Sequence, residues 1–205
     1  MRISAHPVRW SELRGMAITQ FEEVHFTAEN WAGHAMPGRV YESCTFERCD
    51  LGRADLSRSR FVDCTFTACD LSLVKLQGAS LQDVRFTECK LLGVDLSVCN
   101  AMLLKVAFTG CKLDHAVFAG LKLKGTRFAQ CSMRGVDLTG ADLEQVALAQ
   151  CDLQDAVFER TKLRDADLST AVNLRLDPEA NDLRGAHFSV DGALMLLARY
   201  GIRIG

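Results

Sequence analysis

Large apolar residues recur at every fifth position over most of the chain. Twelve consecutive positions of this series over residues 41–96 are large and apolar, and residues 103–168 add fourteen more. The residue two positions before each of them is small or slim, except in the units that carry Arg39 and Leu121. Twenty-six units with this pattern predict a repeating structure rather than a set of independent elements.

A period of five residues fits neither an α-helix nor one straight strand. On a helix, successive large residues would lie about 140° apart and face all round the axis. On a strand, an odd period sends alternate large residues to opposite faces. The pattern becomes consistent if the chain bends by about 90° after each unit and all large residues point into a square coil. Four units, about 20 residues, then make one turn, and successive turns stack in parallel about 4.8 Å apart.

Cysteine and phenylalanine recur with the spacing that a 20-residue turn requires. Both series step by 20 residues, apart from one step of 22 that matches two extra residues in segment 97–102. Because the small inward position suits cysteine as a compact hydrophobe, we interpret these residues as core and not as metal or redox sites. The predicted core ladders comprise Phe46, Phe66, Phe86, Phe108, Phe128, Cys49, Cys69, Cys89, Cys111, Cys131 and Cys151.

Several units carry a recognisable five-residue motif. The segments CDLGRADLSRSRFVDCTF, GVDLTGADLEQ and AVFERTKLRDADLS resemble the A-D/N-L-x-x units of pentapeptide-repeat proteins. The resemblance extends over residues 21–188 and implies an all-β solenoid, a right-handed quadrilateral β-helix with a short C-terminal helix and strand. We expect an N-terminal cap and irregular first coil over residues 1–40, where Gly33, Pro37 and Gly38 interrupt the pattern. The β-helix then occupies residues 41–188, with an irregular loop at 173–182 around Pro178.

The carboxyl end, residues 189–205, changes character. Ser189 is placed to cap a helix from Val190 to Tyr200, with Gly201 to end it. The segment 181–205 resembles the tail of pentapeptide-repeat proteins that target type II topoisomerases, which implies a homodimer. A cap on a monomer is the alternative. The interface residues expected in a dimer are Leu194, Leu197, Tyr200 and the alternating pair Ile202 and Ile204.

Motifs for catalysis or for binding a cofactor or metal are missing from the sequence. It contains no Gly-rich phosphate loop, no H-E-x-x-H, no G-x-S-x-G and no C-x-x-C. The five histidines share no 20-residue spacing. Most aspartates directly precede the large residue of a unit, where turn bonding explains them better than acid–base chemistry. We therefore expect a protein that is not an enzyme and that holds no cofactor.

Charge limits the classes of partner. The chain has 24 Lys and Arg against 26 Asp and Glu, a formal net charge of −2, so we expect no direct nucleic-acid binding. No apolar run is long enough for a membrane span, and the first residues lack the apolar centre of a secretory signal. A cytoplasmic location is the expectation. Segment 97–134 carries six bases against one acid, whereas segment 135–182 carries eleven acids against four bases.

The acidic segment 135–182 suggests a surface that presents carboxylates where DNA presents phosphates. An ordinary solvated charged face is the alternative. The resemblance implies binding to DNA gyrase, or to its relative topoisomerase IV, and an effect on antibiotics that poison these enzymes. The chain lacks long projecting loops, so it resembles the type that protects producers of the gyrase poison albicidin. A scaffold for an unrelated protein partner is the other hypothesis. The candidate partner-binding residues are Asp137, Asp142, Glu144, Asp152, Asp155, Glu159, Asp165 and Asp167.

Overall fold

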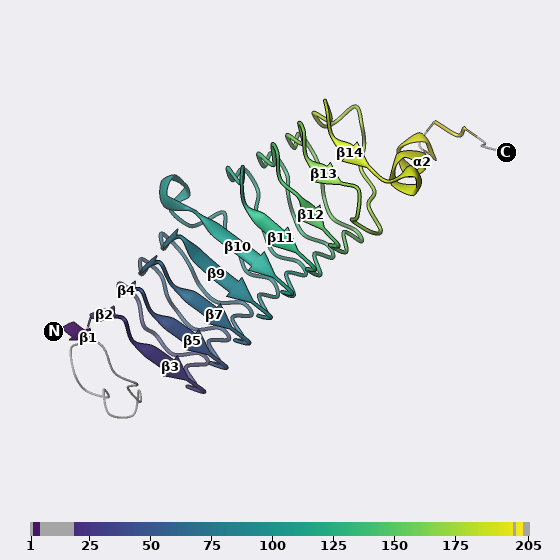
Figure 1. The fold of residues 1–205 in the computed structure, drawn as a ribbon. Helices are drawn as coiled ribbons and strands as arrows, with labels where there is room; N and C mark the ends of the chain where they lie inside the picture. Colours follow the sequence, from purple (N-terminus) through teal and green to yellow (C-terminus); the bar gives the residue numbers. More distant parts are fainter. Residues whose placement is uncertain (1, 5–18, 199, 203–205) are drawn as a thin grey trace.

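The chain winds into a right-handed quadrilateral β-helix of about eight turns that ends in one short helix. The computed structural model describes residues 2–4, 19–198 and 200–202. The first strand and the C-terminal helix lie at opposite ends of the resulting rod (Figure 1). None of the helices within the described segments has the length and apolar character that a membrane span requires.

The regular elements are short because the chain turns a corner after every few residues. The strands are β1 (Arg2–Ser4), β2 (Gln20–Glu22), β3 (His25–Thr27), β4 (Val40–Glu42), β5 (Thr45–Glu47), β6 (Arg60–Val62), β7 (Thr65–Thr67), β8 (Ser80–Gln82), β9 (Val84–Thr87), β10 (Val106–Thr109), β11 (Arg127–Ala129), β12 (Leu148–Ala149), β13 (Asp167–Leu168) and β14 (His187–Phe188). A 3-10 helix, η1 (Ala101–Leu103), precedes β10, and the helix α2 (Val190–Ala198) follows β14.

The rod has four faces, which we number by their order along the chain. The first face carries a parallel sheet in the order β1-β2-β4-β6-β8, and the second carries β3-β5-β7-β9-β10-β11-β12. The strands of the second sheet lie side by side along the rod in Figure 1. On the third and fourth faces, single-residue parallel bridges join each coil to the next. From β2 onward, paired residues are 20 apart, or 22 across the insertion, as in Phe66↔Phe86 and Phe86↔Phe108.

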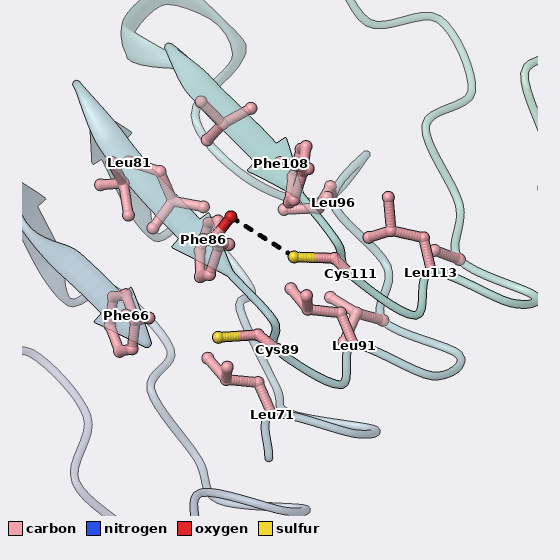
Figure 2. Close-up of a cluster of buried hydrophobic side chains, with 14 of the residues drawn as sticks. Phe66, Leu71, Leu81, Phe86, Cys89, Leu91, Leu96, Phe108, Cys111 and Leu113 are labelled. Atoms are coloured by element: carbon pink, nitrogen blue, oxygen red, sulfur yellow. Dashed lines mark hydrogen bonds between the residues drawn. The ribbon is translucent and has the colours of Figure 1, made fainter. Parts of the chain in front are cut away.

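The large and small residues of each unit fill the interior. All five phenylalanines and all six cysteines of the predicted ladders are buried. Ring centroids are 4.3 Å apart between Phe46 and Phe66, and 5.2 Å apart between Phe86 and Phe108, with the rings nearly parallel in both pairs. Figure 2 shows Phe66, Phe86 and Phe108 stacked along the axis with Cys89 and Cys111 beside them. The five-residue period thus places one large side chain from each unit in a continuous core.

Most corners rely on a residue with positive φ, two positions after the large residue. Arg53 (φ +56°) and Leu73 (φ +55°) adopt this conformation, which is unfavourable for residues with a Cβ. Glycine is therefore frequent there. At Gly135 a side chain would also collide, because a Cβ would lie 2.6 Å from Nδ1 of His115 on the preceding coil.

The small inward residue often donates a hydrogen bond to the preceding coil. The Cys111 Sγ lies 3.4 Å from the carbonyl oxygen of Phe86, as Figure 2 shows. Thr161 Oγ1 donates to the carbonyl of Leu138 at 2.9 Å, and Asn181 Nδ2 donates to that of Phe158 at 3.1 Å. Cysteine, threonine and asparagine at this position therefore provide compact buried donors as well as volume.

We expect Thr161→Val to lower the free energy of unfolding by about 1 kcal/mol, the usual net contribution of one hydrogen bond. The substitution keeps the shape of the side chain and removes the hydroxyl that donates to Leu138. Thr126→Val is the matched control, because Thr126 holds the same position in its unit and its hydroxyl makes no hydrogen bond within the described residues. Denaturant unfolding of the two variants measures the difference. Equal stability of both would exclude a stabilising role for this bond.

Segment 31–40 continues the coil, where we expected an irregular first turn. Trp31 and Met36 are buried at the large inward positions. Gly33 and Gly38 occupy the corner positions, with φ of +67° and +69°. These glycines therefore serve regular corners, and this coil has the same burial pattern of large residues as the later ones.

Leu103 does not point inward as expected. It lies in η1 and is 41% exposed, because the two extra residues let segment 101–104 loop out. The loop is held at both ends, by the Asn100 N–H donating to Ala79 O and the Lys105 N–H donating to Leu81 O, each at 2.8 Å. Figure 1 shows it projecting from the rod before β10. On the next coil, the buried Leu121 supplies apolar volume that Leu103 does not.

The pattern changes again at the irregular loop expected at 173–182. Leu174 is buried, whereas Asn173, which holds the fifth-residue position, is exposed with φ +57°.

Beyond this loop, Ser189 caps α2 through a hydrogen bond from the Gly192 N–H to Oγ at 3.0 Å. The helix ends at Ala198, before the expected Tyr200. Ile202 lies outside any strand, and Ile204 lies outside the described residues.

Candidate functional site

The eight candidate acidic residues surround the rod and do not form one stripe. Aspartates at equivalent positions of successive units fall on successive faces, because each unit turns the chain by one corner. Their bridge partners place Asp137 on the fourth face, Asp142 on the first, Asp152 on the third and Asp167 on the second. The other four follow from their units: Glu144 and Asp165 on the first face, Asp155 on the third and Glu159 on the fourth.

Three of these carboxylates are paired with cations on neighbouring coils. Asp142 lies 3.8 Å from Lys162 and Glu144 lies 3.7 Å from Lys124, measured between the charged atoms. Asp152 accepts a 2.6 Å hydrogen bond from Nε of Arg134. On the first face the ladder alternates in sign, through Lys122, Asp142, Lys162 and Asp182. Positive and negative charges therefore alternate on this face, which is not a uniformly negative surface.

The remaining five acids carry the uncompensated negative charge. Within the described chain, no ion pair reaches Asp137, Asp155, Glu159, Asp165 or Asp167. All of them except the half-buried Asp137 are exposed. Surface carboxylates without a cation beside them give the strongest local field, so they are the best candidates for binding a basic partner.

Aspartates that precede a large residue also hold the corners. In each case the carboxylate accepts a hydrogen bond from the backbone N–H two residues later, as from Thr139 to Asp137 and from Ser169 to Asp167, both at 2.9 Å. The Ser169 hydroxyl, followed by this backbone N–H, holds the pKa of Asp167 below its usual range. The turn bonding expected from the sequence is thus present.

Within the described segments, the residues that commonly bind metals do not gather into a metal site. In the residues that the structure describes, no group of three or more His, Cys, Asp or Glu could hold a metal ion. All nine cysteines are buried and reduced. A hollow of about 730 Å³ lies between α2 and the last coils, and includes Asp155, Arg175 and Met195 in its lining. Residues from the end of the β-helix and from the terminal helix line it together.

The terminal helix leaves apolar side chains uncovered. Leu194 and Leu197 are more than one third exposed, and Tyr200 and Ile202 are about half exposed. Gly192 and the half-buried Leu196 lie on the side of α2 that meets the rod, since a Cβ at Gly192 would contact Phe188. Leu194 and Leu197 therefore lie on the side of α2 that the rod does not cover. Tyr200 also contacts the rod, because its hydroxyl donates a hydrogen bond to Glu179 Oε1 at 3.1 Å.

Two exposed features were not singled out from the sequence. Val190 extends the apolar stripe of α2, and Met102 projects from η1 with 93% of its surface exposed. The helical spacing of Val190, Leu194 and Leu197 was available as a signal. Met102 was hidden by the insertion, because the phase of the repeat is undefined there.

Comparison with known proteins agrees with this fold. A trypsin-treated form of QnrB1, a plasmid-mediated fluoroquinolone resistance protein, is 20% identical with a TM-score of 0.69, covering 100% of this chain and 97% of that one. HetL, a pentapeptide repeat protein involved in heterocyst differentiation regulation in the cyanobacterium Nostoc sp., is 18% identical with a TM-score of 0.67, covering 90% and 94%. No curated protein matches the chain.

A protein-family model identifies the repeats themselves. The model described as the pentapeptide repeat region matches residues 41–118 and, in an overlapping match, residues 101–172. Together these matches span more than half of the 205 residues. The chain therefore belongs to the pentapeptide repeat family.

Proposed function

We propose that this protein binds a type II topoisomerase, DNA gyrase, in place of DNA, and so protects the enzyme from antibiotics that poison it or modulates their action. The observation that carries the proposal is the set of five carboxylates without cation partners, distributed around the carboxyl-terminal half of a straight rod. QnrB1, which shares the fold, is a fluoroquinolone resistance protein. The tail of this chain, residues 181–205, also resembles that of the topoisomerase-targeting members of the family.

Electrostatics supports a site for a basic groove. The segment 135–182 has eleven acids and four bases, and three of those bases, Arg160, Lys162 and Arg164, lie close together within residues 160–164. The uncompensated acids occur on all four faces, so a groove that wraps the rod meets negative charge from each side. The basic saddle in which an enzyme binds DNA is a groove of this kind. Such attraction is steered by charge and weakens as salt rises.

The terminal helix provides a way to double the length of the rod. We propose that the apolar stripe of α2 pairs with its copy about a two-fold axis, with Leu194, Leu197, Tyr200, Ile202 and Ile204 at the interface. About eight turns at about 4.8 Å give each monomer a length of roughly 38 Å. The two acidic halves would then meet at the centre of an elongated body, long enough to cross a two-fold DNA gate.

A non-catalytic scaffold with an unrelated protein partner is the second candidate. The observation in its favour is the likeness to HetL, which matches the fold nearly as well as QnrB1 does and has a role in differentiation. Both candidates use the outer surface of the rod, but only the first requires the unpaired acids of segment 135–182.

Charge reversal tests the first candidate. We expect the triple variant Asp155→Lys, Glu159→Lys, Asp165→Lys to lose about tenfold or more in apparent affinity for gyrase, about 1.4 kcal/mol. These residues are exposed and unpaired, whereas reversing Asp142 or Asp152 would put a lysine beside Lys162 or Arg134 and disturb folding. The measurements are gyrase supercoiling and drug-stabilised DNA cleavage as functions of protein concentration.

A matched control separates local charge from net charge. The triple variant Glu23→Lys, Asp63→Lys, Glu88→Lys changes the net charge equally, at exposed corner positions of the amino-terminal half. We expect it to retain wild-type potency, with native circular dichroism in both triple variants. Equal potency of the wild type and the carboxyl-terminal triple variant would rule out DNA mimicry. A wild type without effect on gyrase or topoisomerase IV would favour the scaffold.

A further inference from the structure

The insertion before β10 places an apolar knob on the first face. Met102 and Leu103 form this knob, with 93% and 41% of their surfaces exposed. The Asn100 side chain accepts a hydrogen bond from the Met102 N–H at 3.2 Å and so caps η1. Because backbone hydrogen bonds also hold both ends of the loop, the knob is an ordered projection. Because Met102 and Leu103 are neighbours, the knob presents a continuous apolar surface on an ordered turn, the kind of surface that a binding partner covers.

A groove with basic residues in its lining, which we call the basic ledge, lies beside the knob. One hollow of about 570 Å³ runs from Met102 to Thr126, and a second of about 380 Å³ continues from Gly125 past Arg127 on the second face. The two hollows share Gly125 and Thr126, so they form one groove around the corner. The space beside Gly125 at this corner is open, since a Cβ there would meet nothing within 4 Å.

The ledge is positively charged. Its lining includes the cations Lys105, Lys122, Lys124 and Arg127 against a single carboxylate, Asp83. Lys105 is paired with Asp83 at 2.5 Å and Lys124 with Glu144 at 3.7 Å. Lys122 and Arg127 have no ion pair with any residue that the structure describes. Two exposed cations thus flank the corner with their charge uncompensated.

We infer that the knob and ledge bind a short acidic segment of a partner protein, which packs an apolar side chain on Met102 and Leu103. The charge of the groove selects carboxylates, and the knob requires an apolar surface that a phosphate backbone does not offer. A polyanion longer than the groove would also meet the acidic coils that begin at Asp137. This surface is separate from the five unpaired acids, so the inference stands independently of the proposed function.

A synthetic peptide provides the probe. A fluorescently labelled peptide of glutamates around two central leucines is titrated with the full chain, and binding is followed by anisotropy. We expect saturable binding, with amide chemical-shift changes confined to residues 101–105 and 122–127. A peptide with serines in place of the leucines should bind about tenfold more weakly, because it cannot cover the knob. No binding of the leucine peptide, or shift changes elsewhere, would overturn the inference.

Paired variants locate the contact. Met102→Ser and Lys122→Gln should each weaken peptide binding about tenfold or more. Leu73→Ser and Lys112→Gln are the controls, because both residues are exposed on the third face, away from the groove, and we expect no change. An oligo-thymidine of similar length that bound the ledge as tightly as the peptide would overturn the assignment to a protein partner. Lys122→Gln should preserve or improve the effect on gyrase, which keeps the two hypotheses distinguishable.

Discussion

Replacing Phe108 with alanine should lower the free energy of unfolding by about 3–5 kcal/mol, the largest stability effect expected in this protein. Phe108 is fully buried, and its ring stacks on Phe86 at 5.2 Å and on Phe128 at 5.4 Å. The Phe118 ring packs against it in a T-shaped arrangement, with the two ring centroids 5.9 Å apart. The backbone ladders on both sides of β10 fix the spacing of the coils, so the walls cannot collapse into the cavity.

Chemical denaturation, followed by circular dichroism, measures the change. Leu103→Ala is a sharp control, because Leu103 occupies the same phase of the five-residue repeat but lies in η1, outside the core. We expect that variant to change the free energy of unfolding by less than about 1 kcal/mol, as for a partly exposed side chain. If Phe108→Ala were no more destabilising than Leu103→Ala, the continuous ring ladder would not be the main source of stability in this part of the rod.

The repeat made the coils predictable because one rule determines every inward position. A residue such as Phe86 must point inward for the chain to bend consistently, and its neighbour two positions earlier must be small for the same reason. The rule fails where chain length changes. At the insertion, Leu103 and Leu104 were equally suitable as inward residues by type, and only backbone geometry determines that Leu103 turns out and Leu104 packs against the core. At Asn173, the following Leu174 takes the inward place.

The charged surface was predictable in composition but not in pattern. A count over segment 135–182 yields its negative charge, yet pairing depends on residues one coil apart. Lys122, Asp142, Lys162 and Asp182 lie at steps of 20 and alternate in sign, so aligning the sequence in 20-residue rows would have revealed this alternation of charge. The knob at Met102 could not be found this way, since it lies in the segment that the rows leave unaligned.

The terminal helix leads to the second large effect. Leu197→Asp should convert the proposed dimer into monomers, because it places a charge in the apolar stripe formed with Val190 and Leu194. These three residues share one side of α2 through their i, i+4 and i+7 spacing, and Leu197 is 39% exposed. In a two-fold interface each substitution acts twice, so two carboxylates would be buried near the axis.

Light scattering coupled to gel filtration tests this expectation at micromolar protein concentration. The wild type should have twice the monomer mass of 22.6 kDa, and Leu197→Asp should have the monomer mass. Leu73→Asp is the matched control, since Leu73 is 50% exposed on the third face and lies far along the chain from α2. It should remain dimeric. The rod does not depend on Leu197 for its core, so both variants should retain the wild-type circular dichroism spectrum. A wild type that is monomeric at micromolar concentration would contradict the two-fold interface, and the uncovered stripe of α2 would then be only the cap of a single rod.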